Sequence, residues 1–164
     1  MSYNNINKFF DDFMKSASGK TAVARLARVN SFNKANMTIS ATALPTNENA
    51  VINNIPVATI RNGDYMVYYP PRAGDVVVLL FCDNDITNIK LGEDNKETER
   101  MHDITDAICV GGIALVSDEL SPLDADGLCL QTLDGKAGIA ITKDGNINVF
   151  AKHFKVEAER IDLN

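Results

Sequence analysis

The C-terminal segment, residues 126–164, constrains the fold most strongly, because it alternates apolar and polar residues in short stretches that cannot bury their own apolar side. An alternation with a period of two is typical of strands with one buried face. Two Asp-Gly pairs, Asp134-Gly135 and Asp144-Gly145, stand ten residues apart between these stretches, and Asp-Gly is a strong signal for a hairpin turn. We therefore expect a succession of short strands separated by tight turns.

The predicted strands cover residues 128–132, 138–142, 146–150 and 154–158. Their apolar positions form one stripe, which identical neighbours must cover because so short a segment cannot form a compact core alone. The simplest arrangement is a parallel homotrimer wound around one axis, which would be a rigid shaft. Its predicted core consists of Leu128, Leu130, Ile139, Ile141, Ile147, Val149, Val156 and Ala158.

The chain has 164 residues, of which 45% are hydrophobic, enough for one folded domain with an appendage. Its longest apolar run, residues 76–82, is too short to cross a bilayer as a helix. Residues 1–5 lack the pattern of a signal peptide, so we expect synthesis in the cytoplasm. The three cysteines have no CxxC spacing and each has apolar neighbours, which favours reduced, packed thiols over a metal site or a disulfide framework.

The net charge of −6 is unevenly distributed, because residues 1–30 carry +3, residues 31–125 carry −8 and residues 126–164 carry −1. A protein that follows a nucleic-acid backbone needs a basic surface, since phosphate neutralisation supplies most of the non-specific affinity. The middle of this chain is acidic instead, so we expect no nucleic-acid partner.

The N-terminal arm, residues 1–20, contains a predicted amphipathic helix. Its apolar stripe consists of Ile6, Phe9, Phe10, Phe13 and Met14. A helix of this length is not stable without a partner. It either folds back on its own domain or docks on another protein through its phenylalanines, and the sequence leaves both alternatives open.

Residues 21–116 are rich in predicted strands. Strand-like stretches occupy residues 22–29, 37–41, 55–60, 65–69 and 76–81. A turn over residues 33–36 predicts a hairpin. Pro56 indicates that it lies in an edge strand or at the start of a strand. Four or five strands in about sixty residues indicate a small barrel. The acidic, Pro-containing residues 117–125 are the predicted linker to the shaft.

Four segments of the middle region carry a family resemblance. They are residues 23–29, 55–57, 71–86 and 100–108, the last of which contains the run His-Asp-Ile-Thr-Asp-Ala. In this order they resemble the N-terminal OB domain of the central, membrane-puncturing spike proteins of contractile-tailed phages, which are related to baseplate assembly protein V. The match covers about residues 21 to 115.

The resemblance implies an all-β chain in four parts: a short N-terminal helix (1–20), an OB-fold barrel (21–116), a linker (117–125) and a trimeric, intertwined β-helix shaft (126–164). It implies a homotrimer in the tail baseplate of a virion, attached under the tail hub, that pierces the host cell envelope when the sheath contracts. Phe9, Phe10 and Phe13 are then the expected contacts with the hub.

The chain departs from the resemblance at its C-terminus. Members of the family often end in an apex where His-x-His from three chains holds an iron ion, whereas His153 here stands alone between Lys152 and Phe154. We therefore predict no metal-binding residue, and the shaft is either short and blunt or capped by a separate spike-tip protein. The second alternative is favoured, because exposed strand ends otherwise pair with other chains.

Candidate catalytic and metal-binding residues are few. His102 and Asp103 are adjacent, but neighbouring residues point in different directions, so a hydrogen bond that orders the loop is the favoured interpretation over catalysis. Residues 83–88 lack the glycine and the closing glutamate of a calcium-binding EF-hand loop, so Asp83, Asp85 and Asp94 are predicted to lie in solvated turns. We expect no enzymatic activity and no cofactor.

A second class of function stays open from the sequence. Tyr65, Tyr68 and Tyr69 could stack on bases as side chains of OB domains do, although their acidic surroundings disfavour this. The alternative to a structural spike is therefore an oligomeric OB-fold module that binds nucleic acid or saccharide, and such binding to single strands would weaken steeply with salt.

Overall fold

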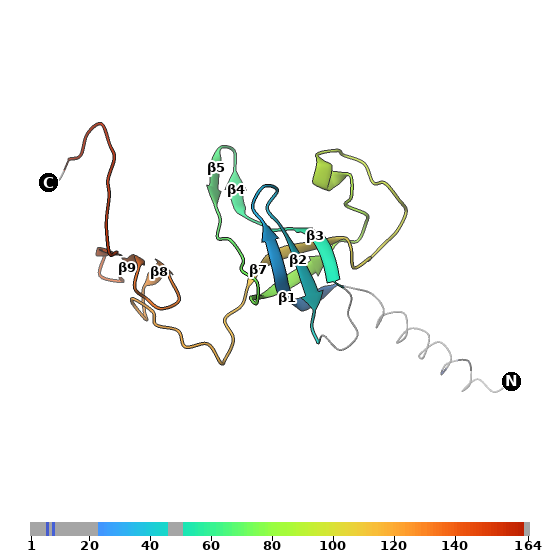
Figure 1. The fold of residues 1–164 in the computed structure, drawn as a ribbon, viewed down its shortest axis with the longest axis horizontal. Coiled ribbons are helices and arrows are strands. Elements are labelled where there is room, and N and C mark those ends of the chain that lie inside the picture. The colour runs from blue at the N-terminus through green and yellow to red at the C-terminus, as the bar shows by residue number, and fades with distance from the viewer. Residues whose placement is uncertain (1–5, 7, 9–22, 46–50, 163–164) are drawn as a thin grey trace. The chain divides into compact units, whose positions relative to one another are not determined.

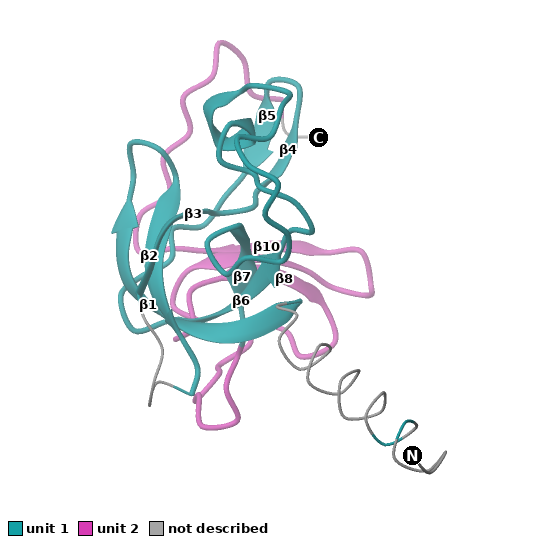
Figure 2. Cartoon of the chain, turned by 90° about the vertical axis from the view of Figure 1, so that its right-hand side faces the viewer, with its two compact units in different colours: residues 1–113 teal, residues 114–164 magenta. Residues whose placement is uncertain are grey.

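The computed structural model describes residues 6, 8, 23–45 and 51–162, and the chain divides into two units, residues 1–113 (unit 1) and residues 114–164 (unit 2; Figure 2). Among these residues no helix is long and apolar enough to span a membrane. Ile6 and Lys8 have helical backbone. The predicted hub contacts Phe9, Phe10 and Phe13 lie outside the described residues.

Unit 1 is built on a curled, five-stranded antiparallel sheet (Figure 1). Its strands are β1 (Ala24–Asn33), β2 (Thr38–Ala43), β3 (Val51–Pro56), β6 (Val76–Phe81) and β7 (Ala107–Gly112), in the spatial order β3-β2-β1-β6-β7. The two edge strands meet at a parallel bridge between Val57 and Cys109, where the Ala58 N–H donates to the Cys109 carbonyl over 2.8 Å. This closure makes an OB-like half-barrel, the coarse fold that the sequence predicts.

The core of the half-barrel follows from alternation along its strands. In β2 the residues Ile39, Ala41 and Ala43 are buried and their neighbours are half-buried. The core cluster consists of Ala27, Val29, Ile39, Ala41, Ile52, Ile55, Val77, Leu79, Phe81, Ala107 and Cys109. The predicted hairpin at residues 33–36 is confirmed, because β1 and β2 pair up to Asn33 and Thr38.

Two further elements of unit 1 lie between these strands. Strands β4 (Ile60–Asn62) and β5 (Tyr65–Val67) form a separate hairpin, and a 3-10 helix, η2 (Ile89–Leu91), lies in the long connection from β6 to β7. Tyr69, which follows the hairpin, places its hydroxyl against Gly111 of β7, where a Cβ would lie 2.8 Å from that oxygen. Gly111 also has a φ of 144°, so this contact depends on glycine.

Unit 2 contains a three-stranded antiparallel sheet of order β10-β9-β8, made of β8 (Leu128–Gln131), β9 (Gly138–Ile141) and β10 (Ile147–Phe150). The two predicted Asp-Gly turns are confirmed, since Gly135 and Gly145 have φ values of 65° and 84° and connect antiparallel neighbours. The predicted strand over residues 154–158 is wrong, because residues 154–158 form no strand. No glycine turn precedes that segment to fold it back, and the single chain forms a sheet with no β-helix among its described residues.

Candidate functional sites

One face of the β8–β10 sheet is apolar throughout. The pairing places Ile141 between Leu128 and Ile147 in one row across the three strands. It places Ile139 between Leu130 and Val149 in a second row. These six residues, which we call the apolar face, were all predicted as shaft core, and the register brings them together. They are 42% to 72% exposed in the single chain.

The opposite face of this sheet is covered in part by the chain itself. Gln131 accepts the Leu123 N–H at its Oε1 and donates from Nε2 to the Ser121 carbonyl, both over 2.8 Å. The Cys129 thiol donates to the Asp124 carbonyl over 3.5 Å. Ala140 of β9, which pairs with Cys129, is 1% exposed. Residues 121–124 thus cover the back of β8, and Ala140 of β9 is buried on the same side, whereas Asn148 and Phe150 on the back of β10 are exposed.

Two predicted shaft residues lie elsewhere. Val156 and Ala158 follow the last strand in a stretch without regular structure, and both are exposed. Their place in a shared core stays a prediction.

A buried ion cluster fixes the long connection between β6 and β7. Arg100 donates from Nε to Asp106 Oδ2 and from Nη2 to Asp85 Oδ1, each over 2.7 Å. Asp85 and Asp106 are fully buried, whereas the Arg100 side chain is 32% exposed. Asp85 also accepts the N–H and the hydroxyl of Thr98 over 2.8 and 2.7 Å. The prediction that Asp85 lies in a solvated turn is therefore wrong.

This cluster holds its charges firmly. Hydrogen bonds from Thr87 and Thr98 hold the pKa of Asp85 below its ordinary value. The hydrogen bond from Arg100 lowers the pKa of Asp106, and the same bond raises the pKa of Arg100. All three groups stay ionised near neutral pH, so they are not suited to exchange protons with a substrate at that pH. We interpret the cluster as an ion pair network that stabilises the connection between β6 and β7.

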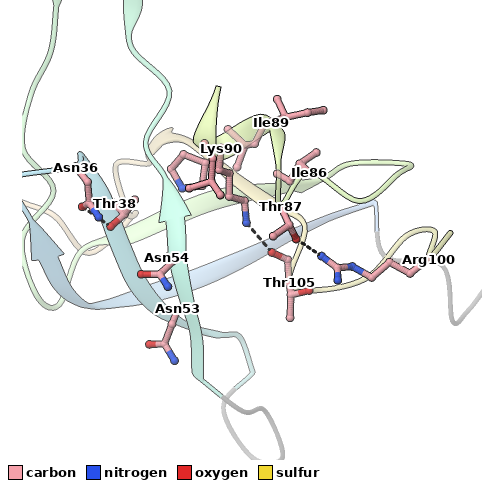
Figure 3. Close-up of a pocket in the computed structure, with 13 residues that line it drawn as sticks. Asn36, Thr38, Asn53, Asn54, Ile86, Thr87, Ile89, Lys90, Arg100 and Thr105 are labelled. Atoms are coloured by element: carbon pink, nitrogen blue, oxygen red, sulfur yellow. Dashed lines mark hydrogen bonds between the residues drawn. The ribbon is translucent and has the colours of Figure 1, made fainter. Parts of the chain in front are cut away.

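A cavity of about 770 Å³ lies beside this cluster (Figure 3). It is lined by Asn36, Thr38, Asn53, Asn54, Pro56, Ile86, Thr87, Ile89, Lys90, Leu91, Arg100, Thr105 and Ile108. These residues come from β2, β3, β7 and the two connections next to them, which is where OB folds bind extended ligands. Lys90 donates to the Thr105 carbonyl over 3.2 Å across one wall. The described lining contains no aromatic ring on which a base could stack.

The other candidate residues are not brought together. The Thr105 N–H and hydroxyl bind Asp103 Oδ1 over 2.8 and 2.6 Å, which orders the loop and lowers the pKa of Asp103. His102 lies with Nδ1 3.6 Å from Asp83 Oδ1 and has a φ of 51°. Tyr65 and Tyr68 are exposed on or next to the β4–β5 hairpin and line no part of the cavity.

The ion cluster was missed by sequence reasoning, although it left a signal. Asp85 stands just before Ile86, which is buried, and Asp106 stands just before Ala107, the first residue of β7. Neither aspartate alone indicates a buried ion pair, because neighbouring side chains point in different directions; the signal is that Arg100 lies between two aspartates that each stand beside an apolar residue.

Comparison with known proteins identifies one family. The family described as "Phage protein Gp138 N-terminal domain" matches residues 21–112, more than half of the chain. The match spans the whole five-stranded sheet and ends at the last residue of β7. No curated protein matches the chain.

Proposed function

Because the chain belongs to the family of phage proteins with a Gp138 N-terminal domain, we propose that it is the central spike of a phage tail baseplate. In this proposal three copies assemble through the apolar face, attach under the tail hub, and pierce the host cell envelope when the sheath contracts. The protein acts mechanically and has no enzymatic role.

The apolar face is the observation that supports assembly of identical chains. Its six side chains form two complete rows over three strands, while the opposite face is already covered over β8 and β9. Monomeric soluble proteins rarely expose a contiguous apolar patch of this kind unless it is a binding surface. Three such faces around one axis bury one another, and a cyclic arrangement closes without leaving a copy uncovered.

The remaining parts of the proposal concern the two ends of the spike. The phenylalanine stripe of the N-terminal arm contacts the hub, and a separate tip protein caps the C-terminal end. Both partners follow from the resemblance described above, and in this proposal the protein is a virion component located in the baseplate.

The test is the mass of the purified chain in solution by light scattering, repeated after brief heating in detergent. Three chains of 17.9 kDa give about 54 kDa, and a resistant species of that mass is expected. Labelling of tail particles with an antibody against unit 1 should mark the baseplate end. A monomer at all concentrations, or label along the tail tube, would refute the proposal.

A second function is favoured by the position of the cavity. Its place on β2 and β3 is that of the ligand site of OB folds, which supports a binding module for nucleic acid or saccharide. Titration with fluorescent single-stranded oligonucleotides at rising salt, and a glycan array, test it. The absence of an aromatic platform in the described lining makes the spike the stronger proposal.

A further inference from the structure

The β4–β5 hairpin is a two-stranded ribbon without support. Neither strand pairs with the five-stranded sheet, and all residues of both strands are exposed. Figure 1 shows the ribbon extending away from the curled sheet. A two-stranded hairpin on its own is marginally stable in water, so this ribbon needs packing that the described part of unit 1 does not supply.

The two faces of the hairpin differ in chemistry. Ile60 pairs with Val67, and Asn62 pairs with Tyr65, so Ile60, Tyr65 and Val67 share one face with Asn62. Ile60 is 77% exposed and Tyr65 is 84% exposed. Arg61 pairs with Met66 on the other face. Tyrosine, methionine and arginine are all enriched in protein–protein interfaces.

The charges of the hairpin suit contact between identical copies. Arg61 and Asp64 sum to zero, and neither forms an ion pair with any described residue. The whole chain carries −6, whereas this ribbon is neutral and brings no like-charge repulsion to a contact between two copies, and its Arg61 and Asp64 could pair across such a contact.

A cyclic trimer also requires two different contact surfaces on each copy, and the hairpin has two. A ring of three copies uses a heterologous interface, in which one surface of each copy meets a different surface of the next. A ribbon exposed on both faces provides two such surfaces. A cation from one copy can also lie on the ring of a tyrosine from its neighbour.

We propose that the β4–β5 hairpins of three copies pack in a ring, with the Ile60, Tyr65 and Val67 face of each copy on the Arg61 and Met66 face of the next. The inference rests on the proposed trimer, because assembly of the β8–β10 sheets holds the three hairpins at an effective concentration on the order of millimolar. This contact makes unit 1 a part of the trimer interface.

Hydrogen–deuterium exchange of the full-length protein, read by mass spectrometry, tests this. Peptides over residues 58–69 report on the hairpin, and peptides over residues 128–150 report on the sheet of unit 2. We expect slow exchange in both regions. In the variant Tyr65→Ser with Val67→Ser, hairpin exchange should become roughly tenfold faster or more, while the sheet stays protected.

The control variant is Leu91→Ser, which removes an apolar side chain of similar exposure, 75%, from η2 of the same unit. It should leave hairpin exchange unchanged. If the hairpin exchanges fast while the sheet of unit 2 is protected, this inference is overturned but the proposed trimer is not. The same conclusion follows if the hairpin is protected only in tail particles. Fast exchange in the sheet would overturn the trimer itself.

Discussion

The substitution Ile147→Asp should prevent assembly of the trimer and leave the single chain folded. Ile147 is 67% exposed in the single chain, so most of its burial is available only to assembly. Full burial of such a side chain contributes about 1.5–3 kcal/mol, of which roughly 1–2 kcal/mol per copy remains to be gained. Three copies would lose roughly 3–6 kcal/mol, and three carboxylates near one axis add repulsion and desolvation.

A loss of this size weakens assembly by about 10²- to 10⁴-fold. Light scattering over a dilution series measures it as a change from about 54 kDa, three times 17.9 kDa, toward 17.9 kDa. Circular dichroism of the same samples checks that strand content is retained.

The matched control is Asn148→Asp, which adds the same charge one residue later. Asn148 pairs with Ala140 and points to the other face of the sheet, so this variant should stay trimeric. The reasoning fails if both variants assemble, if both dissociate, or if Asn148→Asp alone dissociates.

Three further predictions concern unit 1. Arg100→Met leaves two buried carboxylates without a cation, so the urea midpoint of unfolding should fall clearly more than in Lys96→Met, which removes an exposed ion pair. Equal midpoints would contradict a stabilising role of the ion cluster. The folded-state pKa of Asp106 lies below the ordinary 3.8, so its stabilisation is complete above about pH 5 and is lost on acidification below 3.8, as the unfolded chain takes up the proton first; Asp106→Asn should lower stability at neutral pH and flatten this acid decline in urea titrations. Gly111→Ala should lower the melting temperature, because its Cβ would lie 2.8 Å from the Tyr69 hydroxyl at a φ of 144°; Tyr69→Phe in the same chain should recover part of the loss, and no recovery would mean that backbone strain alone is responsible.

Local sequence signals predicted the parts of the fold that depend on few residues. Gly135 and Gly145 adopt the positive φ that the Asp-Gly pairs indicated. The alternation in residues 128–149 placed six apolar residues on one face, since register follows from turns of fixed geometry. Pro56 lies in an edge strand, as its missing N–H indicated, although that strand covers Val51–Pro56 and not the predicted residues 55–60.

Features that depend on distant residues were not predictable in this way. Alternation alone predicted a strand at residues 154–158, but a strand forms only where a neighbour is within reach, and no turn returns the chain there. Asp85 and Arg100 both stand in polar stretches typical of loops, and Asp85 is buried because Thr98 and Arg100, from later in the same connection, bind its carboxylate. A periodicity reports the side chains of one element and says nothing about which loops will meet.

The cover that residues 121–124 place on the back of the β8–β10 sheet also limits how far assembly can proceed. Fibrils of stacked sheets need two bare faces on every layer, so that each new layer leaves a fresh surface for the next. Here the backs of β8 and β9 are covered, so only the apolar face and the back of β10 can receive a further layer. Once the apolar face is buried against its partners, the surface left for stacking is about one strand wide, which disfavours growth of stacked sheets beyond the closed assembly.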